Sequence, residues 1–347
     1  MIPAKKYQCD TRRRSFIKGA ALLGLGAATT GLLPARSAEA VLFGAKEYKV
    51  STTRLAMGTY VNMTAIHPSR DQAQEAFALA FAEIDRLTGL LSRFEADSPV
   101  ARLNSSGLLR HAPQEVLELV ARSLYYHRQS NGAFDITVKP LIDLYRQSFA
   151  DGHKPSEEQI DSALDRVGTD QLRFQDGHVA FTRADMGITL DGIAKGFIVD
   201  RAAEILSRHG VTNHLINAGG DIRTSGAAAK GKPWTIAVQD PAKKREYPDI
   251  ITLTSGAIAT SGNYEVYYDN EKMFHHIIDS RSGHSPVHSS SVTVQAPTVM
   301  DADALSTSIF VMPPAAGLAL IAGQPGCACF VIAANGDTHQ SPSWQSS

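Results

Sequence analysis

Helical and strand-like periodicities are mixed along this chain without regular alternation, and this mixture is the strongest constraint on its fold. Apolar residues recur at helical spacing in residues 69–94, 113–132, 156–167, 193–210, 300–312 and 315–323. Patterns typical of strands cover residues 53–67, 171–175, 178–182, 187–190, 214–220, 234–239, 250–256, 274–279, 291–297 and 327–334. Consecutive strands without helical crossovers pair antiparallel, so we expect an α+β fold with mixed, mainly antiparallel sheets flanked by helices. Neither a repeat nor a clear linker interrupts the pattern, which favours one domain over residues 41–347.

The first forty residues differ in composition from the rest of the chain. A basic start that contains "RRSFIK" (residues 13–18) precedes an Ala/Gly/Leu stretch, and "PARSAEA" follows it. This order is typical of an export signal, and the paired arginines resemble the twin-arginine pattern. The weakly apolar stretch is about 15 residues long, whereas a spanning helix needs about 20. We therefore expect residues 1–40 to be a twin-arginine signal peptide that is cleaved near Ala40, and the mature protein to be periplasmic and not an integral membrane protein.

The expected net charge changes when the signal is set aside. The whole chain has 34 Lys and Arg against 35 Asp and Glu; residues 1–40 hold seven and two of these, which leaves 27 against 33, or about −6. A moderately acidic protein with one short basic run, "KKRE" at residues 243–246, offers no electrostatic surface for nucleic acid. Cys327 and Cys329 lie two positions apart in an apolar segment. So close a pair rarely forms a relaxed disulfide, and we expect two buried thiols.

Residues 300–312, "MDADALSTSIFVM", have two interpretations. Asp301 and Asp303 complement a helix N-terminus, and the apolar stripe that follows describes a capped, amphipathic helix in which Asp301 is a cap. Asp303 and Thr307, however, lie four residues apart on one helix face. A carboxylate and a hydroxyl could there offer oxygens to one hard cation such as Mg²⁺. The segment alone leaves both interpretations open.

Three turns rich in small residues could bind phosphate. In "TLDGIAKGF", residues 192–195 mark a strand-to-helix junction whose backbone N–H groups and Lys195 favour an anion. "NAGGDI" (217–222) and "TSGNY" (260–264) offer a tight turn and hydroxyls. Each could equally be a plain helix start, a turn or a hairpin end.

Two further segments carry side chains suited to a cofactor or a base. Strand alternation puts His275 and His276 on opposite faces, so at most one of them faces a given cleft, and either could be structural. In "GAFDITVKPL" (132–141), Phe134 and Asp135 stand at the entry to extended structure. They could hold a heterocycle, or they could be a core residue and a cap.

Taken in order, eight motifs resemble those of the ApbE-like FAD:protein FMN transferases. They are "AMGTYV", "LSRFEADSPVARLN", "GAFDITVKPL", "LDGIAKGFIVD", "INAGGDI", "ATSGNYE", "HHIIDSRSG" and "DADALSTSIFVM", and they run from about Met57 to Met312. The resemblance implies an α+β fold related to the T-fold, FAD as donor and Mg²⁺ as cofactor. It further implies transfer of FMN through a phosphoester to a threonine of a partner protein, with release of AMP.

The resemblance also assigns roles to residues of this chain. It implies Mg²⁺ ligands at Asp303, Thr307 and the backbone carbonyl of Gly192. It implies FAD contacts at Met57, Phe94, Ala133, Phe134, Asp135, Thr189, Lys195 and Ile277. His276 matches a family histidine and is our candidate general base for the acceptor threonine, so that catalytic roles fall on His276 and Asp303. Three positions depart from the family: Thr189 stands where an acid that contacts FAD is common, Ser306 where some relatives have an acid, and "DSRSG" replaces Asp-Pro-Arg-Thr-Gly.

The expected acceptor is another protein, because this chain lacks the full threonine motif of the family's acceptors. Export would make membrane respiratory subunits with periplasmic flavin domains, such as a NosR-like protein, candidate partners. Two other functions are open. The same site could act as a periplasmic FAD pyrophosphatase that gives free FMN and AMP, or the protein could be a flavin carrier or assembly factor that binds FAD without turnover. The full set of metal-site residues argues against the carrier.

Overall fold

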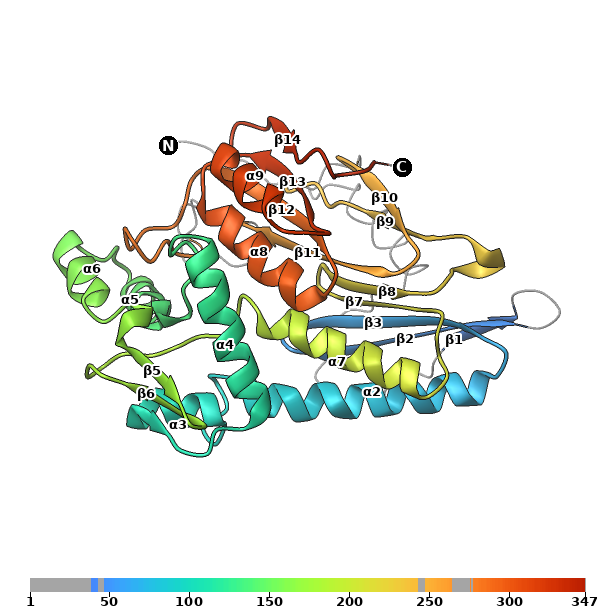
Figure 1. Ribbon diagram of the computed structural model, residues 1–347, viewed down its shortest axis with the longest axis horizontal. Coiled ribbons are helices and arrows are strands. Elements are labelled where there is room, and N and C mark those ends of the chain that lie inside the picture. The colour runs from blue at the N-terminus through green and yellow to red at the C-terminus, as the bar shows by residue number, and fades with distance from the viewer. Residues whose placement is uncertain (1–38, 43–46, 243–246, 264–274, 276, 347) are drawn as a thin grey trace, which may run out of the picture. The chain divides into compact units, whose positions relative to one another are not determined.

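The computed structural model describes residues 39–42, 47–242, 247–263, 275 and 277–346 (Figure 1). The predicted signal peptide lies almost wholly outside these residues, and its export and cleavage stay predictions. The expected cleavage point after Ala40 falls within strand β1 (Glu39–Leu42), which pairs with β2 (Tyr48–Ala56). None of the described helices is both long and apolar enough to cross a bilayer.

Antiparallel pairing dominates the part of the chain that the structure describes. A nine-stranded sheet has the order β1-β2-β3-β7-β8-β11-β12-β13-β14, and each neighbouring pair in it is antiparallel. Its remaining strands are β3 (Thr59–His67), β7 (His214–Ala218), β8 (Asp221–Ser225), β11 (Gly256–Gly262), β12 (Ser289–Ala296), β13 (Ala328–Ala333) and β14 (Thr338–Gln340). Two small sheets comprise β4 (Leu108–Leu109), β5 (Leu172–Gln175) and β6 (His178–Phe181), and β9 (Trp234–Ala237) and β10 (Ile250–Leu253). The α+β fold with mainly antiparallel sheets is confirmed.

Helices pack against the large sheet and against one another. They are α2 (Arg70–Leu91), α3 (Pro99–Ser106), α4 (Gln114–Gln129), α5 (Lys139–Ala150), α6 (Glu157–Leu164), α7 (Ala194–Arg208), α8 (Val299–Val311) and α9 (Pro314–Ala322), with 3₁₀ turns η1 (Ile136–Val138), η2 (Thr169–Gln171) and η3 (Ala229–Gly231). In Figure 1, α2 and α7 lie side by side, and α8 lies between α7 and strands β11 and β12, in agreement with their contacts. The main hydrophobic core fills the space between this helical layer and the sheet, and it includes Met63, Ile84 and Phe310.

Two helix starts follow the signals in the sequence, and a third differs from expectation. The Ser69 hydroxyl accepts the N–H of Gln72 at 3.3 Å at the start of α2, and Ser156 forms a capping box at α6. At α8, Thr298 is the cap, because its hydroxyl accepts the N–H of Asp301 at 3.1 Å. The prediction that Asp301 caps this helix is therefore wrong.

The Asp301 carboxylate instead joins α8 to α4. Its Oδ1 accepts hydrogen bonds from Arg122 Nη2 at 2.7 Å and from Tyr126 Oη at 2.8 Å. Helix α8 is also buried on nearly all sides and is not amphipathic. It lies inside the fold, which explains why its polar residues Asp303, Ser306 and Ser308 are buried as well.

The N-terminal ends of α7 and α8 approach each other closely at Gly196. A Cβ at Gly196 would come within 2.4 Å of the Val299 carbonyl oxygen, so only glycine fits this approach. Asp200, one turn further along α7, accepts the N–H groups of Val299 and Met300 at 3.1 and 2.9 Å. Asp303 on α8 in turn accepts the Gly196 N–H at 3.1 Å. The two helix starts therefore cap each other, and this fixes the segments that precede them.

The predicted strand over residues 53–67 is two strands, β2 and β3, which form a hairpin. Met57 and Gly58 have φ values of 51° and 73°, and Ala56 pairs with Thr59 across the turn. Two consecutive residues with positive φ make the tight turn that suits the twist of a two-residue hairpin. Gly58 is visible in the sequence as a residue that favours a turn, but no sequence feature predicts the left-handed conformation of Met57.

The predicted strand at residues 187–190 does not form, and of residues 274–279 the structure describes 275 and 277–279, where His275 makes a single β-bridge and no strand continues from it. At Ile188, the side chain of Asn104 takes the place of a strand partner: it accepts the Ile188 N–H at 2.7 Å and donates to the Ile188 carbonyl at 2.9 Å. At His275, the Ser285 hydroxyl does the same, with distances of 3.1 and 3.0 Å. In both cases a polar side chain satisfies the backbone groups that a neighbouring strand would otherwise bind.

Candidate functional site

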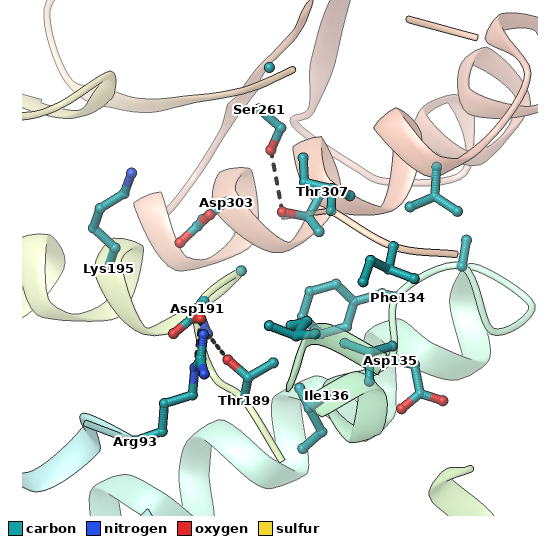
Figure 2. A pocket seen from close by; sticks show the side chains of 18 of the residues that line it. Arg93, Phe134, Asp135, Ile136, Thr189, Asp191, Lys195, Ser261, Asp303 and Thr307 are labelled. Carbon is teal, nitrogen blue, oxygen red and sulfur yellow. Dashed lines mark hydrogen bonds and ion pairs between the residues drawn. The ribbon is translucent and has the colours of Figure 1, made fainter. Parts of the chain in front are cut away.

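A cleft opens where the start of α7, the middle of α8, the end of β11 and the turn before η1 meet (Figure 2). The residues that line it are Arg93, Ala133, Phe134, Asp135, Ile136, Val138, Ile142, Thr189, Asp191, Gly192, Lys195, Thr260, Ser261, Gly262, Ile277, Ile278, Asp303, Thr307 and Val311. Nine of the twelve residues expected at the site are thus at this cleft, although they come from segments far apart in the sequence. Met57 and Phe94 lie outside its lining, and His276 lies outside the described residues.

The three expected metal ligands lie together on one wall of the cleft. Asp303 is 6% exposed, and Figure 2 shows Asp303 and Thr307 on the same side of α8. Gly192 packs directly against Thr307, because a Cβ at Gly192 would come within 3.1 Å of Thr307 Oγ1. Within the described residues there is no group of three His, Cys, Asp or Glu side chains that could hold a metal. The expected ligand set contains one carboxylate, one hydroxyl and one carbonyl.

Hydroxyl groups form a cluster behind these ligands. Ser261 Oγ, at the end of β11, lies 2.9 Å from Ser306 Oγ and 3.3 Å from Thr307 Oγ1. Ser306 is fully buried and donates to the Asp303 carbonyl oxygen at 3.0 Å. Of the expected phosphate-binding turn at residues 260–264, Thr260, Ser261 and Gly262 line the cleft but belong to strand β11, and residue 264 lies outside the described residues.

Lys195 supplies a positive charge at the cleft, and its ion pair with Asp221 was not predicted from the sequence. Its Nζ lies 3.4 Å from Asp221 Oδ2, and the Asp221 side chain is 1% exposed. Asp221 follows the predicted glycine turn, which is confirmed by φ values of 64° at Gly219 and 101° at Gly220. A buried carboxylate at this point holds the ammonium group near the cleft, where a second anion could reach it.

Aromatic and apolar side chains form a second wall, which meets the first at Gly192. Phe134 lies against Gly192, because its Cε2 would be 3.3 Å from a Cβ there, and the buried Ile277 also faces the cleft. Thr189 is buried, and its Oγ1 accepts the Asp191 N–H at 3.2 Å. This wall offers a flat ring and an aliphatic surface to a ligand.

Asp135 lines the cleft, but its carboxylate is engaged elsewhere. Its Oδ1 accepts the Thr137 N–H at 2.7 Å and caps η1, and its Oδ2 lies 3.4 Å from His127 Nδ1. Burial raises the pKa of this carboxyl group. Figure 2 shows the carboxylate directed away from Asp303 and Thr307. The expected entry to extended structure at this point is wrong, because the cap begins a 3₁₀ turn that leads into α5.

Arg93 and Asp191 also line the cleft, but the sequence analysis did not assign them to the site. Arg93 Nε lies 3.0 Å from Asp191 Oδ2, and its guanidinium carbon lies 4.3 Å from the centre of the Phe94 ring. Phe94 is 67% exposed beside the cleft. Both missed residues stand inside motifs that drew attention for other reasons, "LSRFEAD" and "LDGIAKG". Their pairing could not be inferred from the spacing.

The remaining expected residues lie in different surroundings. Met57 is half-buried and packs on the main core in the β2–β3 turn. His275 is buried, and its Nε2 lies 3.2 Å from the Pro286 carbonyl oxygen, which makes it a structural residue. Cys327 and Cys329 are free and buried, as expected, and burial raises their pKa values to about 11 and about 12.

Known proteins match the chain over most of its length. A model of the ApbE family matches residues 57–331. The chain is 30% identical over 339 residues to the FAD:protein FMN transferase of Klebsiella pneumoniae (strain 342), which covers 93% of each chain. Among solved structures, the ApbE protein from Thermotoga maritima gives a TM-score of 0.77 at 29% identity, covering 85% of this chain and 97% of that one. The flavin transferase ApbE from Vibrio cholerae gives 0.73 at 27% identity, covering 86% and 98%.

Proposed function

The chain belongs to the ApbE family and is an FAD:protein FMN transferase, and from this premise we propose that it uses Mg²⁺ to transfer the FMN part of FAD to a threonine of a partner flavoprotein. In this reaction the threonine oxygen forms a bond to the phosphorus of the FMN half. The bond from that phosphorus to the bridging oxygen breaks, the hydroxyl proton passes to a base, and AMP leaves.

The observation that carries the proposal is the meeting of Asp303, Thr307 and Gly192 at the cleft that Lys195 also lines. A carboxylate, a hydroxyl and a backbone carbonyl are hard oxygen donors, and this chemistry fits Mg²⁺. The close packing of Gly192 on Thr307, where a Cβ would come within 3.1 Å of Thr307 Oγ1, supports the fit. When bound there, Mg²⁺ would neutralise negative charge on a diphosphate.

The other residues of the cleft have roles that follow from their chemistry. Lys195, held 3.4 Å from Asp221, would bind a phosphate oxygen, since an ammonium group can serve two anions. Phe134 and Ile277 would contact the flavin ring. We propose His276 as the base that takes the threonine proton, although it lies outside the described residues.

The location and the acceptor are also part of the proposal. The twin-arginine pattern and small-residue cleavage site in residues 1–40 support export to the periplasm. A periplasmic transferase would meet the periplasmic flavin domains of membrane respiratory proteins, of which a NosR-like subunit is one candidate. Mass spectrometry of such proteins with and without this chain would detect FMN mass on a threonine peptide.

The test of the reaction itself uses the purified chain, FAD, MgCl₂ and an acceptor protein that carries a threonine flavinylation motif. We expect covalent flavin on the acceptor and one AMP for each flavin attached, and loss of both when EDTA removes Mg²⁺. Free FMN and AMP with no covalent flavin would instead indicate a pyrophosphatase. Tight FAD binding without AMP release would indicate a carrier, and either result would overturn the proposal.

A further inference from the structure

The hydroxyl cluster behind the proposed metal ligands has a fixed order of hydrogen bonds. Ser306 Oγ donates to the Asp303 carbonyl oxygen at 3.0 Å. A carbonyl oxygen can only accept, so the direction of this bond cannot reverse. Because a serine hydroxyl has one proton, Ser306 has none left for Ser261, and Ser261 Oγ at 2.9 Å must be the donor between them.

The same count fixes the proton of Thr307. Ser261 gives its single proton to Ser306, so at the 3.3 Å contact it can only accept from Thr307 Oγ1. The bonds therefore run from Thr307 to Ser261, to Ser306 and to the Asp303 carbonyl. Ser306 is fully buried, and Ser261 and Thr307 are half-buried. Water has little access to compete at the inner bonds.

We infer that Ser261 and Ser306 are positioning residues that turn the Thr307 proton away from the cleft and leave the Thr307 lone pairs for a divalent cation. This inference rests on the proposed function, because it gives Thr307 the role of a metal ligand. A hydroxyl coordinates a cation through its lone pairs, and a proton directed at the cation would repel it. Hydrogen bonds around a ligand that orient it in this way commonly change metal affinity by about 10- to 100-fold when removed.

Ser306→Ala is the most informative change. It removes the acceptor of the Ser261 proton, and Ser261 can then donate to Thr307 and turn the Thr307 proton toward the cleft. Ser261→Ala removes the acceptor of the Thr307 proton. Ser261→Thr keeps a hydroxyl at that position and serves as the conservative variant. Ser308→Ala is the matched control, because Ser308 is a buried hydroxyl on the same helix that donates to the Ala304 carbonyl outside this chain of bonds.

The measurement is the dissociation constant of Mn²⁺, read from the electron paramagnetic resonance signal of the free ion in full-length protein with a fixed concentration of FAD. FAD without protein provides the blank. We expect Ser306→Ala and Ser261→Ala to bind Mn²⁺ about 10-fold more weakly than the unchanged chain, and Ser261→Thr and Ser308→Ala to bind it as tightly. The double variant should lose no more than either single variant, since both interrupt one chain of bonds. In the transfer reaction, the Mg²⁺ concentration for half-maximal rate should rise while kcat at saturating Mg²⁺ stays the same.

Two results would overturn the inference alone. One is unchanged Mn²⁺ affinity in both alanine variants, and the other is an equal loss in Ser308→Ala, which would mean that any buried hydroxyl on α8 matters. If the unchanged chain binds no Mn²⁺ even with FAD, the metal site of the proposed function fails and the inference fails with it. Thermal unfolding of each variant shows whether it is folded before Mn²⁺ is added.

Discussion

Asp303 contributes a negative charge to the cleft and also accepts the Gly196 N–H at 3.1 Å. Asp303→Asn separates the two contributions, because an amide oxygen can still accept the backbone hydrogen bond but carries no charge. We expect the variant to fold and to lose FMN transfer by about 100-fold or more, the scale of losing one electrostatic group in an active site. The measurement is covalent flavin formed on the acceptor per minute at saturating Mg²⁺.

Asp301 is the matched control for that change. It stands two residues away on the same helix, but its carboxylate binds Arg122 and Tyr126. Asp301→Asn should therefore lower the free energy of unfolding and leave the transfer rate per folded molecule unchanged. If Asp303→Asn transferred flavin at a near-normal rate, its assignment as a metal ligand would be wrong.

His214 makes stability depend on pH. It is fully buried, its Nδ1 lies 2.8 Å from the Val211 carbonyl oxygen, and burial lowers its pKa, with Arg223 as a further positive neighbour. Because its pKa is lower in the folded than in the unfolded chain, only the unfolded chain binds a proton as the pH falls below about 6.5. The contribution of His214 is therefore present above that pH and is lost below it, toward the lowered pKa of the folded state.

The check is urea unfolding of the unchanged chain and of His214→Gln at pH 7.5 and pH 5.5. Glutamine does not titrate, so the difference in unfolding free energy between the two pH values should be smaller in the variant. An equal difference in both proteins would show that other groups carry the pH dependence.

At the residue scale, spacing within a segment predicted which side chains of the site lie together, whereas the separation of two segments along the chain did not. Asp303 and Thr307 could be paired from the sequence because a helix puts residues four apart on one face. Arg93 and Asp191 stand 98 positions apart, and nothing in either segment indicates the 3.0 Å contact between them. The same applies to Lys195 and Asp221, where a glycine turn drew attention but the buried ion pair did not.

Gly196 allows the close approach of α7 and α8, and its substitution can be compared with that of Gly89, a second helical glycine. A Cβ at Gly196 would lie 2.4 Å from the Val299 carbonyl oxygen and 2.8 Å from Met300 Cα, both backbone atoms that cannot move alone. Gly196→Ala should therefore force α7 and α8 apart and cost about 1–3 kcal/mol of unfolding free energy. Transfer activity should fall as well, because Asp303 would move relative to Gly192.

Gly89→Ala in α2 is the control for backbone entropy. Apart from its chain neighbours and the backbone of its own helix, no heavy atom lies within 4 Å of a Cβ there, so alanine should stabilise the chain by about 0.5–1 kcal/mol. Guanidinium unfolding of both variants gives the comparison. If Gly196→Ala were as stable as Gly89→Ala, the close approach of the two helices would not limit this position.

At the element scale, the longer periodic helices were predicted, whereas α3, α5 and several short extended segments were not. In long periodic segments such as residues 193–210, many apolar positions fit the helical period, and α7 lies within that range. For residues 187–190 and for residues 53–67, one residue in each case decides the outcome. Asn104, more than eighty positions away, satisfies the backbone at Ile188, and Met57 adopts a left-handed conformation that its side chain does not favour.

At the scale of the whole molecule, the cleft joins the two halves of the chain. One wall comes from the turn before η1, and the other comes from α7, β11 and α8, which are brought together by the antiparallel sheet and the mutual capping of α7 and α8. Local periodicity predicts such a sheet but not its strand order, because β8 pairs with β11 and skips the two strands between them. Periodicity could not indicate which distant segments share the cleft. The order of the eight motifs did so, because the family resemblance assigns site residues in several of these segments.

A ligand that contacts both walls should stabilise the whole fold and not only one helix. Any ligand that binds the folded chain alone stabilises it by about 2.7 kcal/mol at 100 times its dissociation constant. FAD with MgCl₂ should therefore raise the thermal midpoint by several degrees, since about 1 kcal/mol corresponds to about 2–4 °C for domains of 150–250 residues. EDTA should remove the part due to Mg²⁺ and leave the part due to FAD.

In Asp303→Asn, FAD should still raise the midpoint, and MgCl₂ should add nothing because the variant lacks the charged ligand. If MgCl₂ added the same rise to Asp303→Asn as to the unchanged chain, Mg²⁺ would be acting away from this cleft, and the ligand set of Asp303, Thr307 and Gly192 would have to be abandoned.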